Sequence, residues 1–224
     1  MIRTDESGRL LSIILDRPAR RNALTRGALA DLESAVRGAE TPVISLAGAG
    51  EAFCAGADLE TVRSLDGDEA RAFAREGQAA LEAIETSDSV VVAGIDGAAR
   101  GGGVELALAA DLRIATPDAS FAEPGVSMGI FGAWGGTRRL PRAVGESHAL
   151  DLSLSGRTVD AHEAKTMGLV SRIVEDPRAV ASSIAEHDRG ALRRIKHLVR
   201  DQRPTADHHE REAEAFAELL AAES

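Results

Sequence analysis

Strand-like and helix-like segments alternate along the first half of the chain, and no other feature constrains the fold as strongly. Strand-like apolar runs occupy residues 10–15, 43–47, 89–95 and 111–115, and helix-like segments occupy residues 25–37 and 68–85. In the helix-like segments apolar residues recur at the spacing of one helical face. Residues 89–95 (SVVVAGI) instead form a β-branched run typical of a strand buried on both sides. The alternation predicts an α/β fold in which parallel strands are joined by helical crossovers.

The second half of the chain has a different pattern. From about Ala133 onward it becomes helical, except for a strand-like stretch at residues 169–174. We expect two closing helices, at about residues 179–199 and 205–222. The last of these is amphipathic and fits an oligomer contact, although a solvated terminal helix with one buried stripe fits the same pattern.

Charge and composition narrow the range of partners. The 224 residues carry a net charge of −10 and only 3% of them are aromatic, so nucleic acid is not an expected partner. No apolar run reaches the roughly 18–20 residues that a membrane span requires. The acidic residues of the N-terminal segment MIRTDE do not fit a signal peptide. Because a single cysteine, Cys54, also agrees with a reducing compartment, we expect a cytoplasmic protein without membrane association.

The first candidate site is the segment 50–59 (GEAFCAGADL), where a strand runs into a series of small residues. Small side chains leave backbone N–H groups uncovered, and such groups are suited to binding an oxyanion. A tight turn that buries Phe53 and Cys54 explains the same pattern. Because no basic residue flanks Cys54 to activate its thiol, we expect this cysteine to be buried and inert.

The second candidate site is the segment 98–106 (AARGGGVEL). Three glycines at a helix start expose N–H donors at the positive end of the helix dipole. Glu105 lies three residues after Gly102 and therefore on the same helix face, where a carboxylate could move a proton. A glycine turn followed by a surface glutamate is the alternative. The spacing is not that of a nucleotide-binding glycine motif.

The third candidate site is the segment 121–129 (FAEPGVSMG), which contains the letters of a G-x-S-x-G nucleophile motif around Ser127. That motif requires a strand directly before the serine and a helix directly after it. Here Pro124 and Gly129 flank the serine instead, so a serine hydrolase is disfavoured.

Two further groups of charged residues have less specific meanings. Arg17, Arg20 and Arg21 form a basic cluster that could hold phosphates or lie on a solvated surface. His208 and His209 are adjacent on a predicted helix and point to different sides, so no metal site is expected there.

Taken together, the motifs resemble the crotonase (enoyl-CoA hydratase/isomerase) superfamily, in order and with family-like spacing from about residue 10 to residue 174. The segments that carry the resemblance are RP…RNAL (17–24), G…FCAGADL (50–59), GGGVEL…DLRIA (101–115), GGTRRLP (135–141) and GR…A…A…GLV (156–170). The resemblance implies a spiral of ββα turns with a C-terminal helical region used for trimers or dimers of trimers. We place the spiral core at residues 1–155 and the helical region at residues 156–224.

The resemblance also implies an acyl-CoA thioester as the ligand, with no metal or redox cofactor, since the coenzyme A enters as part of the substrate. Matched residue by residue, the two N–H donors to the thioester oxygen are Ala57 and Gly102, and Glu105 is the main acid/base. The arginines near Asn22 match the family's contacts with CoA phosphates. The expected substrate-binding residues are Arg20, Arg21, Ala55, Asp58, Leu59, Gly101, Glu123 and Gly125.

Two departures from the family pattern affect the expected reaction. Gly125 stands where hydratases have a second glutamate, and Glu123 stands two residues earlier, where glutamine is usual. The family's chain also usually continues beyond a final helix like the one at residues 205–222, helping to cover the acyl-CoA. Losing a general acid/base costs about 10²–10⁴ in rate. The rate at which this protein hydrates an enoyl-CoA therefore depends on which residue serves as the second acid/base.

The sequence therefore predicts an acyl-CoA enzyme that stabilises a thioester enolate, with enoyl-CoA hydratase as the first choice. The alternative is an isomerase of 3-enoyl-CoA and 2-enoyl-CoA that uses Glu105 alone. A non-catalytic acyl-CoA-binding protein is a third hypothesis. Decarboxylation and thioester hydrolysis are also compatible with the scaffold, because a fold does not fix its reaction.

Overall fold

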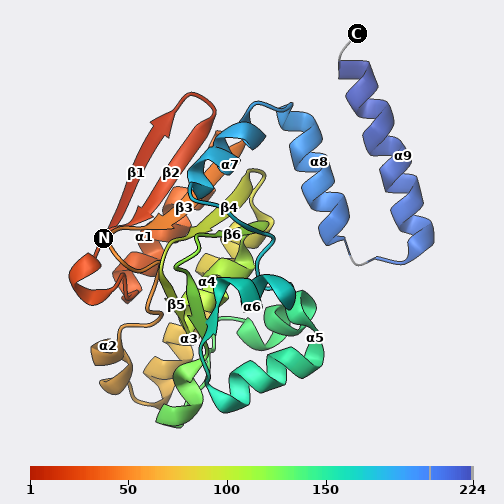
Figure 1. The fold of residues 1–224 in the computed structure, drawn as a ribbon. Coiled ribbons are helices and arrows are strands. Elements are labelled where there is room, and N and C mark those ends of the chain that lie inside the picture. The colour runs from red at the N-terminus through yellow and green to blue at the C-terminus, as the bar shows by residue number, and fades with distance from the viewer. Residues whose placement is uncertain (202, 223–224) are drawn as a thin grey trace.

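Two β-sheets and the helices around them make up the computed structural model, which describes residues 1–201 and 203–222 (Figure 1). In the larger sheet the described strands follow the order β1-β2-β3-β4-β6-β9, and in the smaller sheet β5-β7-β8. The larger sheet consists of β1 (Ile2–Ser7), β2 (Leu10–Leu15), β3 (Val43–Gly48), β4 (Val90–Ile95), β6 (Leu112–Ala115) and β9 (Arg172–Ile173). From β2 to β9 each neighbouring pair is parallel, which confirms the predicted sheet type.

Strand residues alternate between two apolar layers, one on each face of the larger sheet. Val43 of β3 packs in a cluster with Val90 and Val92 of β4 and with α7 (Pro177–Ala185). Ile44 and Val91, one residue further along each strand, pack in the main core with the other helices. Side chains on a strand point alternately to opposite faces, so the β-branched run at residues 89–95 covers both faces at once.

The N-terminal strand β1 was not expected from the sequence. It pairs antiparallel with β2, with Ser7 opposite Leu10 across a turn at Gly8, whose φ is +59°. All of β1 after Ile2 is exposed. An edge strand of this kind buries almost no apolar residues and therefore leaves no period-two pattern in the sequence.

Helices α1 (Arg26–Arg37) and α3 (Gly67–Thr86) lie against each other on the main-core face of the sheet. The Thr25 side chain accepts from the Ala28 N–H and fixes the start of α1. Asp66 and Glu69 form a capping box at the start of α3. The short helix α2 (Leu59–Arg63) precedes α3, and the 3-10 helix η1 (Pro18–Arg20) precedes α1.

The strands of the smaller sheet lead into α4 and η2. Its strands are β5 (Ala98–Arg100), β7 (Ser120–Ala122) and β8 (Val159–Asp160). After β5 the chain enters α4 (Gly102–Ala109), in which every residue is buried. After β7 it enters the 3-10 helix η2 (Pro124–Met128) and then α5 (Gly136–Ser155), which is interrupted at Gly145.

The C-terminal region differs from the sequence expectation in one respect. The single helix expected at residues 179–199 is two helices, α7 and α8 (Arg189–Arg200). The Asp188 side chain accepts from the Ala191 N–H at 2.7 Å and caps the start of α8. A new helix therefore begins in the middle of the segment that was expected to be one helix. The final helix α9 (Thr205–Ala222) has the predicted bounds.

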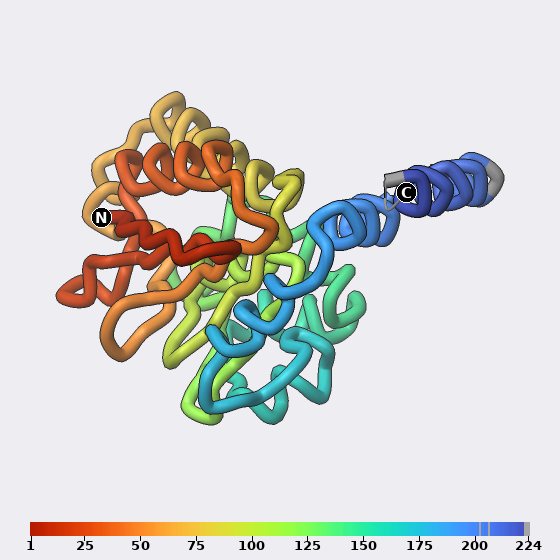
Figure 2. Tube along the Cα trace, turned by 90° about the horizontal axis from the view of Figure 1, so that it is seen from above, coloured from red at the N-terminus to blue at the C-terminus, as the bar shows by residue number. Residues whose placement is uncertain are grey.

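The final helix α9 extends away from the rest of the molecule, beyond α8 (Figures 1 and 2). The boundary expected at residues 155/156 stays a prediction, but chain beyond it still joins the core. There β8 pairs with β7, β9 pairs with β6, and α6 (Ala161–Thr166) packs beside them. No helix among the described residues is both long and apolar enough to cross a membrane.

Candidate functional site

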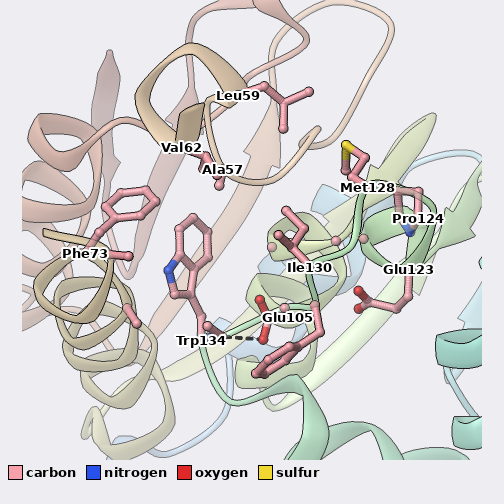
Figure 3. A pocket seen from close by; sticks show the side chains of 18 of the residues that line it. Ala57, Leu59, Val62, Phe73, Glu105, Glu123, Pro124, Met128, Ile130 and Trp134 are labelled. Atoms are coloured by element: carbon pink, nitrogen blue, oxygen red, sulfur yellow. Dashed lines mark hydrogen bonds between the residues drawn. The ribbon is translucent and has the colours of Figure 1, made fainter. Parts of the chain in front are cut away.

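A cavity of about 340 Å³ opens between α2, α3, α4 and the segment 123–134 (Figure 3). Its walls are mostly apolar, and two glutamates supply the carboxyl groups. The predicted site residues that line it are Ala55, Ala57, Leu59, Gly101, Gly102, Glu105, Glu123 and Gly125. Residues from three separate parts of the sequence therefore meet in one cavity.

Backbone hydrogen bonds hold the first two candidate loops together. Cys54 donates its N–H to Ala98 O at 3.1 Å, and Arg100 donates to Cys54 O at 2.9 Å. Gly56 approaches the start of α4 so closely that a Cβ there would lie 2.8 Å from Gly102 N. With φ of +87°, Gly56 also occupies the left-handed region that favours glycine. This packing places Ala57 and Gly102 on the same wall of the cavity.

Glu105 lies almost fully buried in α4, with 1% of its surface exposed. Its Oε1 accepts from the Trp134 N–H at 2.9 Å and from the Gly136 N–H at 2.7 Å. Burial raises the pKa of Glu105, while these two N–H donors and the charge of Arg139 lower it in part. The two donors fix the carboxylate in one orientation at the cavity wall.

Two glycines make room for this carboxylate. A Cβ at Gly132 would lie 2.7 Å from Glu105 Oε2, and a Cβ at Gly136 would lie 2.8 Å from Oε1. Any larger residue at either position requires the carboxylate to shift. Gly132 and Gly136 therefore leave the space that the Glu105 carboxylate occupies, a relation that spacing in the sequence could not reveal.

Glu123 lies in the same cavity, and its carboxyl group faces the same space as that of Glu105 (Figure 3). It is 9% exposed, and its Oε1 has no hydrogen-bond partner within the described part of the chain. Burial, and then the charge of Glu105, raise the pKa of Glu123 to about 8. The Glu123 side chain therefore reaches the cavity that Glu105 lines.

Three of the expected substrate-binding residues lie outside this cavity. Asp58 accepts from the Thr61 N–H at the start of α2 and pairs with Arg17 at 2.6 Å, so its carboxylate is engaged in the fold. These contacts lower its pKa. Arg20 is exposed and pairs with Glu60 at 2.8 Å.

Arg21 lines a second cavity of about 570 Å³, together with Arg100. Ala55 lines both cavities, so the second adjoins the first. Burial and the positive charge of Arg21 lower the pKa of Arg100. Glu51 lines the same cavity, so the two guanidinium groups leave a net positive charge there, which favours an anionic ligand.

Several apolar residues of the cavity are not among the site residues predicted from the sequence. They are Val62, Leu65, Phe73, Met128, Ile130, Phe131 and Trp134. Phe73 and Trp134 pack edge to face with ring centroids 5.6 Å apart. Phe73 lies in the helix expected at residues 68–85, and Trp134 is the one tryptophan of the chain. Neither residue type by itself indicates a ligand.

The competing interpretations of Ser127 and Cys54 have structural answers. Ser127 lies exposed on η2 and donates to Pro124 O at 2.7 Å, so it is not at a strand-to-helix elbow. Cys54 is fully buried, and burial raises the pKa of its thiol to about 12, in agreement with an inert cysteine. No group of three or more metal-ligating side chains occurs among the residues that the structure describes.

An apolar cavity that holds two buried carboxyl groups with raised pKa values defines a class: an α/β protein built to move protons on a bound molecule. A family model for enoyl-CoA hydratase/isomerase matches residues 5–221. The chain belongs to this family, which confirms the resemblance to the crotonase superfamily.

Individual relatives agree with this assignment. The chain is 37% identical over 176 residues to a crotonyl-CoA hydratase of Syntrophomonas wolfei, which covers 76% of this chain and 68% of the relative. The fold is similar to that of an enoyl-CoA hydratase from Thermoplasma volcanium, with a TM-score of 0.93 and 32% identity over 98% of this chain and 92% of the other. An enoyl-CoA hydratase from Bacillus anthracis gives a TM-score of 0.92 at 32% identity, covering 98% and 91% of the two chains.

Proposed function

We propose that the protein is an enoyl-CoA hydratase, which adds water across the double bond of a 2-enoyl-CoA to give a 3-hydroxyacyl-CoA. The observation that carries the proposal is the fixed carboxylate of Glu105, which lines one cavity with Ala57 and Gly102. Relatives named crotonyl-CoA hydratase and enoyl-CoA hydratase support the same reaction.

In this proposal the backbone N–H groups of Ala57 and Gly102 bind the thioester oxygen. Negative charge develops on that oxygen when a nucleophile adds at Cβ, so donors held in place stabilise the enolate without reorganisation. Gly102 is the first residue of α4, where N–H groups have no partner within the helix. Removal of one such donor typically costs about 10²–10³ in rate.

The substrate carries its own coenzyme A, and we propose no resident metal or redox cofactor. The cavity at Arg21 and Arg100 offers positive charge beside the acyl cavity, with Ala55 common to both. That arrangement fits the phosphates of coenzyme A outside and the acyl chain inside. We place the enzyme in the cytoplasm, where acyl-CoA substrates and a free thiol at Cys54 are compatible.

The expected test is hydration of crotonyl-CoA, followed by loss of the conjugated enoyl-thioester absorbance. Glu105→Gln keeps an oxygen for the two N–H donors but removes the base, so its rate should fall about 10²–10⁴-fold. Binding of the substrate should change far less. Equal rates for the two proteins would remove Glu105 from the mechanism.

A second candidate is an isomerase of 3-enoyl-CoA and 2-enoyl-CoA. Gly125 favours it, because the family position of the second hydratase glutamate carries no side chain here. One carboxylate suffices to move a proton between two carbons. Formation of conjugated enoyl-CoA from a 3-enoyl-CoA, without consumption of crotonyl-CoA, would identify this reaction; binding without any turnover would identify a non-catalytic acyl-CoA-binding protein.

We also propose that the chain assembles as a homotrimer or a dimer of trimers. Helices α8 and α9 carry exposed apolar side chains that include Ile195, Val199 and Phe216. Several large apolar side chains left exposed on neighbouring helices are suited to an interaction site. The resemblance to the crotonase superfamily, which implies trimers or dimers of trimers, supports further copies of this chain as the partners.

A further inference from the structure

Glu123 combines features that a structural glutamate seldom has. It lies directly after β7 at the start of η2, nine-tenths buried, and lines the acyl cavity. Its Oε1 forms no hydrogen bond with the described residues. A buried carboxyl oxygen without a partner destabilises the fold, so a side chain kept in this state at a cavity wall points to a ligand.

The surroundings divide the two carboxyl groups of the cavity into an ionised and a neutral one. Glu105 accepts two backbone N–H groups and feels the positive charge of Arg139 from α5, so it ionises first. Its negative charge and burial then hold the proton on Glu123, whose pKa lies at about 8. Pairs of groups whose pKa values are pushed apart in this way divide the roles of acid and base.

We propose that Glu123 is a second catalytic residue, which donates its proton to Cα of the bound enoyl-CoA while Glu105 accepts a proton from the attacking water. This inference rests on the proposed hydratase function and supplies the second acid, which the family pattern has at the position of Gly125 and this chain lacks there.

The step balances without a further reactant. The oxygen of water forms a bond to Cβ, and one O–H bond of the water breaks as its proton passes to Glu105. The Cα–Cβ π pair moves through the enolate and forms the Cα–H bond with the proton of Glu123. Glu123 is then ionised and Glu105 neutral, and transfer of one proton from Glu105 to Glu123 through solvent restores the starting state.

Gly125 cannot take this role by gaining a side chain. A Cβ there would lie 2.8 Å from the carbonyl oxygen of Ile130 and 3.2 Å from Cα of Phe131. Both are backbone atoms, so the loop itself would have to move. In this chain the loop after η2 occupies the space of that side chain, and the carboxyl group enters the cavity from Glu123 instead.

The test separates chemistry at Cα from chemistry at Cβ. In deuterated water, the α-protons of butyryl-CoA, which has no double bond to hydrate, should exchange in the unaltered protein. Glu123→Gln should lower the exchange rate about 10²–10⁴-fold, whereas Glu105→Gln should lower it much less. Both variants should lose hydration of crotonyl-CoA, with kcat changed far more than KM.

Ser127→Ala is the matched control, because Ser127 lies on the same 3-10 helix but is exposed. It should change neither rate. Circular dichroism and titration with crotonyl-CoA check that each variant folds and binds.

Each outcome decides the proposal. Loss of exchange in Glu105→Gln with full exchange in Glu123→Gln would assign Cα to Glu105 and overturn it, and so would unchanged hydration in Glu123→Gln. If the unaltered protein exchanges through Glu123 but does not hydrate, the hydratase function fails while the role of Glu123 at Cα stands. If it does neither, both are overturned.

Discussion

Glu105 and Glu123 show how two identical side chains acquire different chemistry from their surroundings. Glu105 receives two backbone donors, whereas Oε1 of Glu123 has no partner among the described residues. The donors come from Trp134 and Gly136, about thirty positions further along the chain. The division of roles therefore depends on tertiary contacts and not on either glutamate's neighbours in sequence.

The raised pKa of Glu123 predicts how stability varies with pH. The folded state holds this proton up to a pKa of about 8, whereas a glutamate in the unfolded chain releases it at a pKa near 4.5. Between these values the folded state binds more protons than the unfolded state, so this group makes stability fall as pH rises from about 4.5 to about 8. Glu123→Gln removes the ionisable proton, and the melting temperature of the variant should exceed that of the unaltered protein increasingly over this range.

Thermal melts at pH 5 and pH 8 measure this difference. At pH 5 Glu123 is neutral and close to glutamine in shape, so the two proteins should melt at similar temperatures. A gap in melting temperature that is the same at both pH values would show that Glu123 does not hold a proton in the folded state.

At the scale of elements, one buried ion-pair group attaches α8 to the larger sheet. Asp111, directly before β6, pairs with Lys196 at 2.9 Å and with Arg200 at 2.8 Å, and accepts from the Val91 N–H at 2.7 Å. Lys196 is buried and also donates to Ser89 O at 2.8 Å. Removing the carboxylate leaves a buried ammonium without its counter-ion, which typically costs about 3–5 kcal/mol.

Asp111→Ala should therefore lower the free energy of unfolding by about 3–5 kcal/mol, as measured by urea denaturation. Asp88→Ala is the matched control: Asp88 pairs with Arg193 and His197 of the same helix but is half exposed. Exposed pairs contribute about 0–1 kcal/mol. Equal losses in the two variants would contradict a special role for the buried pair.

The elements that the sequence predicted well are those whose pattern is local. The bounds of β2 match residues 10–15, and Thr25 caps α1 as its side chain predicts. The sequence did not predict the polar edge strand β1 or the break between α7 and α8, because neither feature strongly changes the spacing of apolar residues. Within the cavity, the motifs pointed to the glutamates and glycines. The places of Phe73 and Trp134 in the cavity depend on how α3 and α4 pack around them, which local sequence patterns do not indicate.

At the scale of the whole molecule, α9 projects from one side, beyond α8 (Figure 2). Ile195, Val199 and Phe216 are 59%, 80% and 64% exposed in the single chain. Burying such side chains stabilises by about 25 cal/mol per Å² of apolar surface. Burial of these side chains between copies of the chain would therefore favour association through α8 and α9.

Light scattering coupled to size exclusion should give a mass of three or six times the 23.4 kDa of one chain. The double variant Val199→Glu with Phe216→Glu places charges in the proposed contact and should reduce that mass toward a single chain. Ala30→Glu, which adds the same charge at an exposed position of α1, should leave the mass unchanged. A single-chain mass for the unaltered protein would overturn the proposed assembly. The exposed apolar side chains of α8 and α9 would then remain in water.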